Sequence, residues 1–220
     1  MRINMTYRNA FATSADFSPT IGADVYAEGP FEGIYRSVLT TDYQTAEFQF
    51  QVGAIYWTTR NGEERRYTLD GGRITIDGRE VWFEIKAHES YFHDPDVADV
   101  LDQAERELAR HDIELDRVDG STLLDEVKLR IIKSIIRHRN VPFGERDVFN
   151  ARAAIDGHGG IAPFGAVAEA LGANRRQAEA MMSAMLIRRA IAFPVDRPVT
   201  PDTPVTLFYR PNRRLTRLTD

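Results

Sequence analysis

The stretch that decides the fold is residues 65–86, RRYTLDGGRITIDGREVWFEIK. Alternation along VWFEIK places every second side chain on the same face of a strand, so Glu84 and Lys86 share one surface. Asp70 ends an earlier strand that we expect to lie beside this one. The pattern fits an ordinary hairpin with a charged outer face, or a site at which Asp70, Glu84 and Lys86 meet around a metal ion.

Turn signals divide residues 47–86 into four expected strands. The dipeptides NG at 61–62 and DG at 77–78 are strong signals for tight hairpin turns. We expect the GG pair at 71–72 to end the strand that precedes it, and a further strand to follow with RITI. These breaks predict a meandering sheet.

Helical patterns flank this sheet. Apolar residues recur at spacings of three and four from Pro30, which predicts a helix over 30–39, and a second amphipathic helix is expected over 96–109. Residues 113–119 resemble another strand, and a long helix is expected to start near Ser121 as its N-cap. Residues 1–24 are polar and aperiodic, so an irregular arm is predicted there. The order of elements predicts an α/β domain over residues 1–140.

The segment VPFG at 141–144 marks the join to a second predicted domain, residues 141–220. Three helix-like runs are followed by two short strands around a Pro-rich loop, which is the winged-helix pattern, and 174–189 would be its recognition helix. The methionines in that helix are expected in the core. Three polar residues near the N-terminus of this helix are candidate contacts to the DNA groove or phosphates: Asn174, Arg175 and Arg176. Small winged-helix domains also bind proteins, so both interpretations stay open.

Composition restricts the class of protein. The chain has 220 residues, of which 43% are hydrophobic and 28% charged, and it contains no cysteine, so disulfides and thiolate metal sites are excluded. We find no signal peptide and no apolar run of about 20 residues, so a cytoplasmic protein that does not enter membranes is expected. The net charge is −5, yet the segment from Arg188 onward carries about +4 and forms a basic tail.

The chemistry of Asp70, Glu84 and Lys86 suits phosphodiester hydrolysis. Carboxylate oxygens are the ligands that Mg²⁺ prefers, and a lysine can orient the attacking water or stabilise charge on phosphate. In the simpler interpretation, Asp70 caps a strand and the other two side chains form an exposed charged strip. The residues alone leave both interpretations open.

The sequence resembles the TnsA-like transposon endonucleases of the restriction-endonuclease-like, PD-(D/E)xK superfamily. The resemblance rests on YTLD at 67–70, EIK at 84–86 and an upstream set at the spacing of the family, Glu28, Glu32 and Gln51. It covers roughly residues 25–209, and the chain departs from the family at Leu69, where a proline is usual. It implies a restriction-endonuclease-like core of mixed sheet flanked by helices, followed by a small winged-helix-like domain.

The resemblance also implies roles for individual residues. Glu32, Asp70 and Glu84 would hold Mg²⁺, with Mn²⁺ as a substitute, and Lys86 would complete the catalytic set. The implied activity is cleavage of one strand of double-stranded DNA at transposon 5′ ends, alongside a DDE transposase and an ATPase regulator. Two alternatives stay open: a stand-alone nuclease in repair, phage processing or restriction, and a non-catalytic DNA-binding or assembly module.

Overall fold

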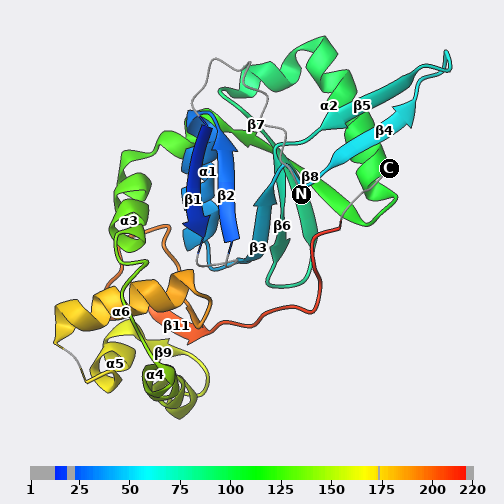
Figure 1. Ribbon diagram of the computed structural model, residues 1–220. Helices are drawn as coiled ribbons and strands as arrows, with labels where there is room; N and C mark the ends of the chain where they lie inside the picture. Colours follow the sequence, from blue (N-terminus) through cyan, green and yellow to red (C-terminus); the bar gives the residue numbers. More distant parts are fainter. Residues whose placement is uncertain (1–12, 19–22, 173, 217–220) are drawn as a thin grey trace.

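A four-stranded mixed sheet forms the centre of the first half of the chain (Figure 1). The computed structural model describes residues 13–18, 23–172 and 174–216. In spatial order the strands are β3 (Thr45–Phe50), β6 (Gly71–Thr75), β7 (Glu80–Lys86) and β8 (Ile113–Asp119). β6 pairs antiparallel with both β3 and β7, whereas β7 and β8 run parallel. The predicted α/β class is therefore confirmed at the level of a mixed sheet flanked by helices.

Each face of the sheet is covered by one helix. α1 (Pro30–Thr41) buries Tyr35 against Phe83 of β7 on one face, with the two rings edge to face at 5.0 Å. α2 (Pro95–Ala109) buries an apolar stripe against Trp82 on the other face. The alternation predicted for VWFEIK is confirmed, because Phe83 and Trp82 belong to opposite cores.

The predicted meander is wrong in its pairing. β4 (Ala54–Thr58) and β5 (Glu64–Thr68) form a separate two-stranded hairpin, which projects from the sheet in Figure 1. The chain leaves β3 at Gln51, whose backbone has a positive φ of 53°, so β3 pairs with β6 rather than with β4. The turns predicted at 61–62 and 77–78 are confirmed, since Gly62 and Gly78 join β4 to β5 and β6 to β7 with positive φ.

The pair Gly71-Gly72 does not break a strand, as the sequence suggested, but begins β6 in the middle of the sheet. A Cβ at Gly71 would collide with the ring of Phe83 and would lie 2.6 Å from the carbonyl oxygen of Gln49. A Cβ at Gly72 would lie 2.9 Å from Trp82. Glycine is needed here because the two large aromatic side chains of β7 occupy the space of the neighbouring side chains.

Two other predicted elements are wrong. The predicted irregular arm contains an antiparallel hairpin, β1 (Thr13–Ser18) and β2 (Ala23–Glu28), while residues 1–12 lie outside the described part. No long helix starts at Ser121, because a 3₁₀ turn, η2 (Gly120–Leu124), comes first. α3 (Glu126–Ile136) begins after it, capped by the side chain of Asp125, which accepts a hydrogen bond from the Lys128 N–H at 2.8 Å. A second 3₁₀ turn, η1 (Glu89–His93), connects β7 to α2.

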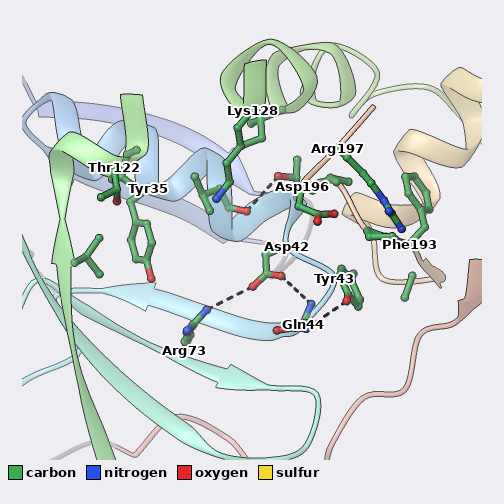
Figure 2. Close-up of a pocket in the computed structure, with 18 of the residues that line it drawn as sticks. Tyr35, Asp42, Tyr43, Gln44, Arg73, Thr122, Lys128, Phe193, Asp196 and Arg197 are labelled. Carbon is green, nitrogen blue, oxygen red and sulfur yellow. Dashed lines mark hydrogen bonds and ion pairs between the residues drawn. The ribbon is translucent and has the colours of Figure 1, made fainter. Parts of the chain in front are cut away.

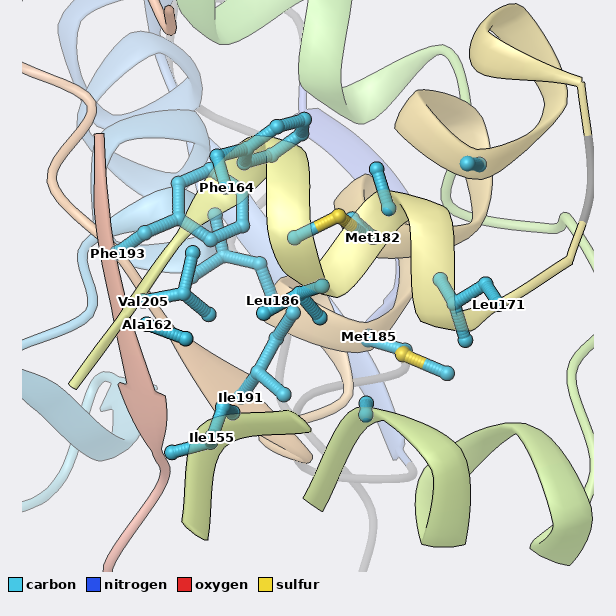
Figure 3. Packing of buried hydrophobic residues seen from close by; sticks show 14 of the residues in the cluster. Ile155, Ala162, Phe164, Leu171, Met182, Met185, Leu186, Ile191, Phe193 and Val205 are labelled. Carbon is cyan, nitrogen blue, oxygen red and sulfur yellow. The ribbon is translucent and has the colours of Figure 1, made fainter. Parts of the chain in front are cut away.

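The second half of the chain has its own apolar core (Figure 3). Its elements are α4 (Glu145–Gly157), β9 (Ala162–Pro163), α5 (Phe164–Ala170), α6 (Arg175–Ile187), β10 (Ile191–Ala192) and β11 (Pro204–Leu207). The strands form an antiparallel sheet in the order β10-β11-β9. Met182 and Met185 of α6 are fully buried in this core, as predicted, and Ile135 of α3 packs into it as well.

The segment 211–216, here called the strap, returns from the second half and lies on the first sheet (Figure 1). Glu80 of β7 is buried, and its carboxylate accepts hydrogen bonds from the N–H and the hydroxyl of Thr216 at 2.8 and 2.7 Å. Arg213 and Arg214 pair with Asp112 and Glu47. Part of the basic tail is thus neutralised within the chain. None of the helices in the described ranges is long and apolar enough to cross a bilayer.

Candidate active site

The carboxyl end of β7 is where the predicted site residues gather. Asp70 lies between β5 and β6, and its Oδ2 accepts a hydrogen bond from the backbone N–H of Ile85 at 2.7 Å. The carbonyl of Asp70 accepts another from the N–H of Gln51 at 2.8 Å. Both bonds fix Asp70 between the end of β3 and the stretch of β7 that carries Glu84 and Lys86. Asp70 is therefore adjacent to β7 although β5, which precedes it, belongs to another sheet.

The carboxylate of Glu84 is the most buried charged group at this end of the sheet, with the residue only 3% exposed. Its Oε1 accepts two hydrogen bonds, from the Tyr67 hydroxyl at 2.7 Å and from Lys86 Nζ at 2.5 Å. Its Oε2 is buried and has no hydrogen-bond partner among the described residues. A buried polar atom without a partner is uncommon in folded proteins and costs free energy. The second oxygen of Glu84 is thus a position at which a cation would be stabilised.

Lys86 connects this buried carboxylate to solvent. Its side chain is 28% exposed and comes from the last residue of β7. An ammonium at this place can reach a group that approaches the sheet from outside.

Glu32 lies on α1, the helix that covers the face of the sheet opposite to α2. It is half-buried in the first turn of α1, and its neighbour Phe31 packs against Gly120. A Cβ at Gly120 would meet the Phe31 ring at 2.6 Å and the Lys86 carbonyl at 2.8 Å. This packing places the first turn of α1 beside the end of β7. Over residues 13–18, 23–172 and 174–216, however, no three His, Asp or Glu side chains form a ready group of metal ligands.

Tyr67 is a residue to which the sequence assigned no role. It lies on β5, opposite Ile55 of β4, yet its hydroxyl reaches Glu84 on the main sheet. Burial raises the pKa of the Tyr67 phenol well above its ordinary value, and the nearby negative charge of Glu84 raises it further. The phenol therefore remains a hydrogen-bond donor at neutral pH. The sequence could not predict this contact, because the contact depends on how the separate β4–β5 hairpin packs against the main sheet.

A cavity of about 1040 Å³ lies between the two halves of the chain and is distinct from this site (Figure 2). Arg73 of β6 lies in its lining and forms ion pairs with Asp42 at 3.4 Å and with Asp116 at 3.6 Å. Lys128 and Arg197 also line it, as Figure 2 shows. Acidic and basic side chains are mixed along its lining.

The donor set around Glu84 fits a hard divalent cation. Asp70 and Glu84 supply carboxylate oxygens, and Mg²⁺ commonly keeps several waters and takes only one or two protein carboxylates beside substrate phosphates. No protein-family model matches the sequence of this chain, and no curated protein matches it significantly.

Proposed function

We propose that this protein is a Mg²⁺-dependent DNA endonuclease of the TnsA type. The observation that carries the proposal is the arrangement at Glu84, where one carboxylate oxygen holds Lys86 and Tyr67 and the other is buried without a hydrogen-bond partner among the described residues. Such a carboxylate beside Asp70 is what a metal-dependent phosphodiesterase requires. The mixed sheet with a helix on each face supports a restriction-endonuclease-like core for the same residues.

Asp70 and Glu84 would hold the cation, with Glu32 contributing from α1. The chemistry that a bound Mg²⁺ supplies is activation of a water and stabilisation of negative charge on the phosphate. Lys86 lies at the exposed edge of the site, so its ammonium would orient the attacking water or contact a phosphate oxygen. The water oxygen bonds to phosphorus, the bond from phosphorus to the 3′ oxygen breaks, and that oxygen leaves with a proton. The products are a 3′-hydroxyl and a 5′-phosphate.

The second half of the chain would bind the DNA or a partner protein. Its order of helix, strand, helix, helix and two strands supports a winged-helix-like domain. Of the proposed recognition helix α6, the residues from Met182 to Ile187 are buried, whereas Arg175 and Arg176 are exposed. Contact with DNA would therefore involve the N-terminal turn of α6. Arg189 is buried and donates to the Leu39 carbonyl at 2.9 Å, so we assign it a structural role.

In this proposal the cut is made at transposon 5′ ends, and the protein acts with a DDE transposase and an ATPase regulator. A plasmid-nicking assay tests the activity with wild type and Glu84→Gln, each with Mg²⁺ and with a chelator. We expect nicking by wild type with Mg²⁺ only, and a loss of at least about 100-fold in Glu84→Gln. Glu114→Gln, an exposed change in the same sheet, is the matched control and should nick like wild type. Equal nicking by Glu84→Gln would exclude the proposed site.

The same assay with partners distinguishes the two enzymatic alternatives. Nicking of arbitrary plasmid by the protein alone would favour a stand-alone nuclease. Cleavage only at transposon ends, and only with the transposase present, would favour the TnsA type. DNA binding without any cleavage in either arrangement would leave the non-catalytic module.

A further inference from the structure

The hydroxyl of Tyr67 reaches Glu84 from outside the sheet that carries Glu84. Tyr67 belongs to the β4–β5 hairpin, and the two residues are separated by 17 positions in the sequence. The ring packs at the edge of the apolar cluster that includes Trp82 and α2. The packing of the ring therefore helps to hold this hydrogen bond in place.

The two oxygens of Glu84 differ sharply in their surroundings. Tyr67 and Lys86 both donate to Oε1, at 2.7 and 2.5 Å, while the buried Oε2 accepts none from the described residues. Two donors on one oxygen restrain rotation of the carboxylate group. Lys86 sits on a flexible side chain that is partly exposed, whereas Tyr67 has a rigid ring. The restraint that persists when Lys86 moves toward a substrate is thus the one from Tyr67.

We propose that Tyr67 is a positioning residue for the divalent-cation site, because its hydroxyl holds Oε1 of Glu84 and so presents Oε2 to the cation. The inference rests on the proposed function and adds to it the residue that orients a metal ligand. Outer-sphere hydrogen bonds of this kind fix the orientation of metal ligands, and their loss weakens metal affinity or activity by about 10- to 100-fold.

Tyr67→Phe tests the proposal, since it removes the hydroxyl and keeps the ring. Tyr56→Phe is the matched control, because Tyr56 lies on the same hairpin and is 48% exposed. Binding of Mn²⁺ to the full chain is measured by electron paramagnetic resonance of the free ion. We expect the dissociation constant to rise about 10-fold or more in Tyr67→Phe and to stay unchanged in Tyr56→Phe. In the nicking assay the Mg²⁺ concentration for half-maximal rate should rise, and saturating Mg²⁺ should restore most of the rate.

Unchanged Mn²⁺ affinity in a folded Tyr67→Phe protein would overturn the inference. Glu84→Gln separates this failure from failure of the proposed function: loss of Mn²⁺ binding there, with wild-type binding in Tyr67→Phe, rejects only the role of Tyr67. Wild-type binding in Glu84→Gln rejects the site itself.

A measurement on the unaltered chain covers the case in which Tyr67→Phe does not fold. With tyrosine labelled by ¹³C at Cζ, one tyrosine resonance should shift when Mg²⁺ is added, and it should not shift in Glu84→Gln. The Tyr56 resonance, identified from Tyr56→Phe, should stay in place. No shift of any tyrosine resonance at saturating Mg²⁺ would overturn the inference.

Discussion

The carboxylate of Asp70 accepts a hydrogen bond from the backbone N–H of Ile85 at 2.7 Å and thereby ties the loop before β6 to the middle of EIK. Asp70→Asn keeps an acceptor oxygen but removes the negative charge, so the protein should fold and lose nicking by at least about 100-fold. Asp70→Ala also leaves the Ile85 N–H without this partner, which costs about 1–3 kcal/mol of folding free energy. Urea unfolding together with the nicking assay checks both changes. Full nicking by Asp70→Asn would contradict a role in holding the cation.

Lys86→Ala should separate catalysis from binding of the cation. Tyr67 still restrains Glu84 in this variant, so Mn²⁺ affinity should remain within a few-fold of wild type. Nicking should fall by about 10²- to 10⁴-fold, the usual contribution of a group that assists proton transfer or charge stabilisation. Lys133→Ala, an exposed change on α3, serves as the control and should nick normally. A Lys86→Ala protein that neither binds Mn²⁺ nor nicks would instead show that Lys86 is needed to hold Glu84 in the orientation that binds the cation.

Gly71→Ala should destabilise the sheet. The added Cβ would collide with the Phe83 ring and the Gln49 carbonyl, so we expect a loss of about 1–3 kcal/mol in the free energy of unfolding. Gly157→Ala at the end of α4 is the control, because a Cβ there meets no atom within 4 Å among the described residues. That control should unfold at the wild-type urea concentration or slightly above it. Equal stability of both variants would show that β6 and β7 separate easily.

The exposed arginines at the start of α6 should matter for DNA affinity. If Arg175 and Arg176 contact phosphates, replacing both by alanine reduces the slope of log affinity against log salt by about 1 for each contact. Fluorescence anisotropy with a labelled duplex at several salt concentrations measures this slope. Arg110→Ala, an exposed arginine at the end of α2, should leave it unchanged. An unaltered slope in the double variant would favour a protein partner for this end of the helix.

Tyr67 should make folding stability sensitive to alkaline pH. Its pKa in the folded protein lies above the ordinary value of 10.0, because of burial and then the charge of Glu84. The unfolded chain therefore releases this proton first, so the contribution is complete below about pH 10 and decreases as the pH rises further. Urea unfolding at pH 9 and pH 11 should show a smaller loss for Tyr67→Phe than for wild type. Tyr35 is raised in the same direction by burial and remains in both proteins.

Local sequence signals predicted an element well where its pattern depends on a single buried face. The alternation in VWFEIK and the periodicity from Pro30 depend on a single buried face each, and both are confirmed. The helix predicted over 96–109 is also confirmed, since Asp94 and Pro95 provide an ordinary start for α2.

Signals that depend on distant partners were missed. Gly71-Gly72 looks like a break in the sequence, because nothing local reveals that Phe83 and Trp82 fill the space beside it. The Tyr67 contact is invisible for a similar reason, since it crosses from a separate hairpin. The place of Asp70 and Glu84 at strand ends, together with the family resemblance, selected these two residues, but it could not show which oxygen of Glu84 lacks a hydrogen bond. The difference between the two oxygens of Glu84 exists only in the folded protein, where Tyr67 and Lys86 both donate to one of them.

The strap affects the order in which parts of the protein can complete their folding during synthesis. Thr216 leaves the ribosome 136 residues after Glu80, the buried carboxylate to which it donates two hydrogen bonds. Until the strap has been synthesised, Glu80 has Trp82 as a donor but lacks both bonds from Thr216. The sheet that carries Asp70 and Glu84 therefore gains its full complement of bonds only after the second half of the chain has been made. During translation, the first half of the chain would therefore be less stable before the strap has been made than it is in the finished protein.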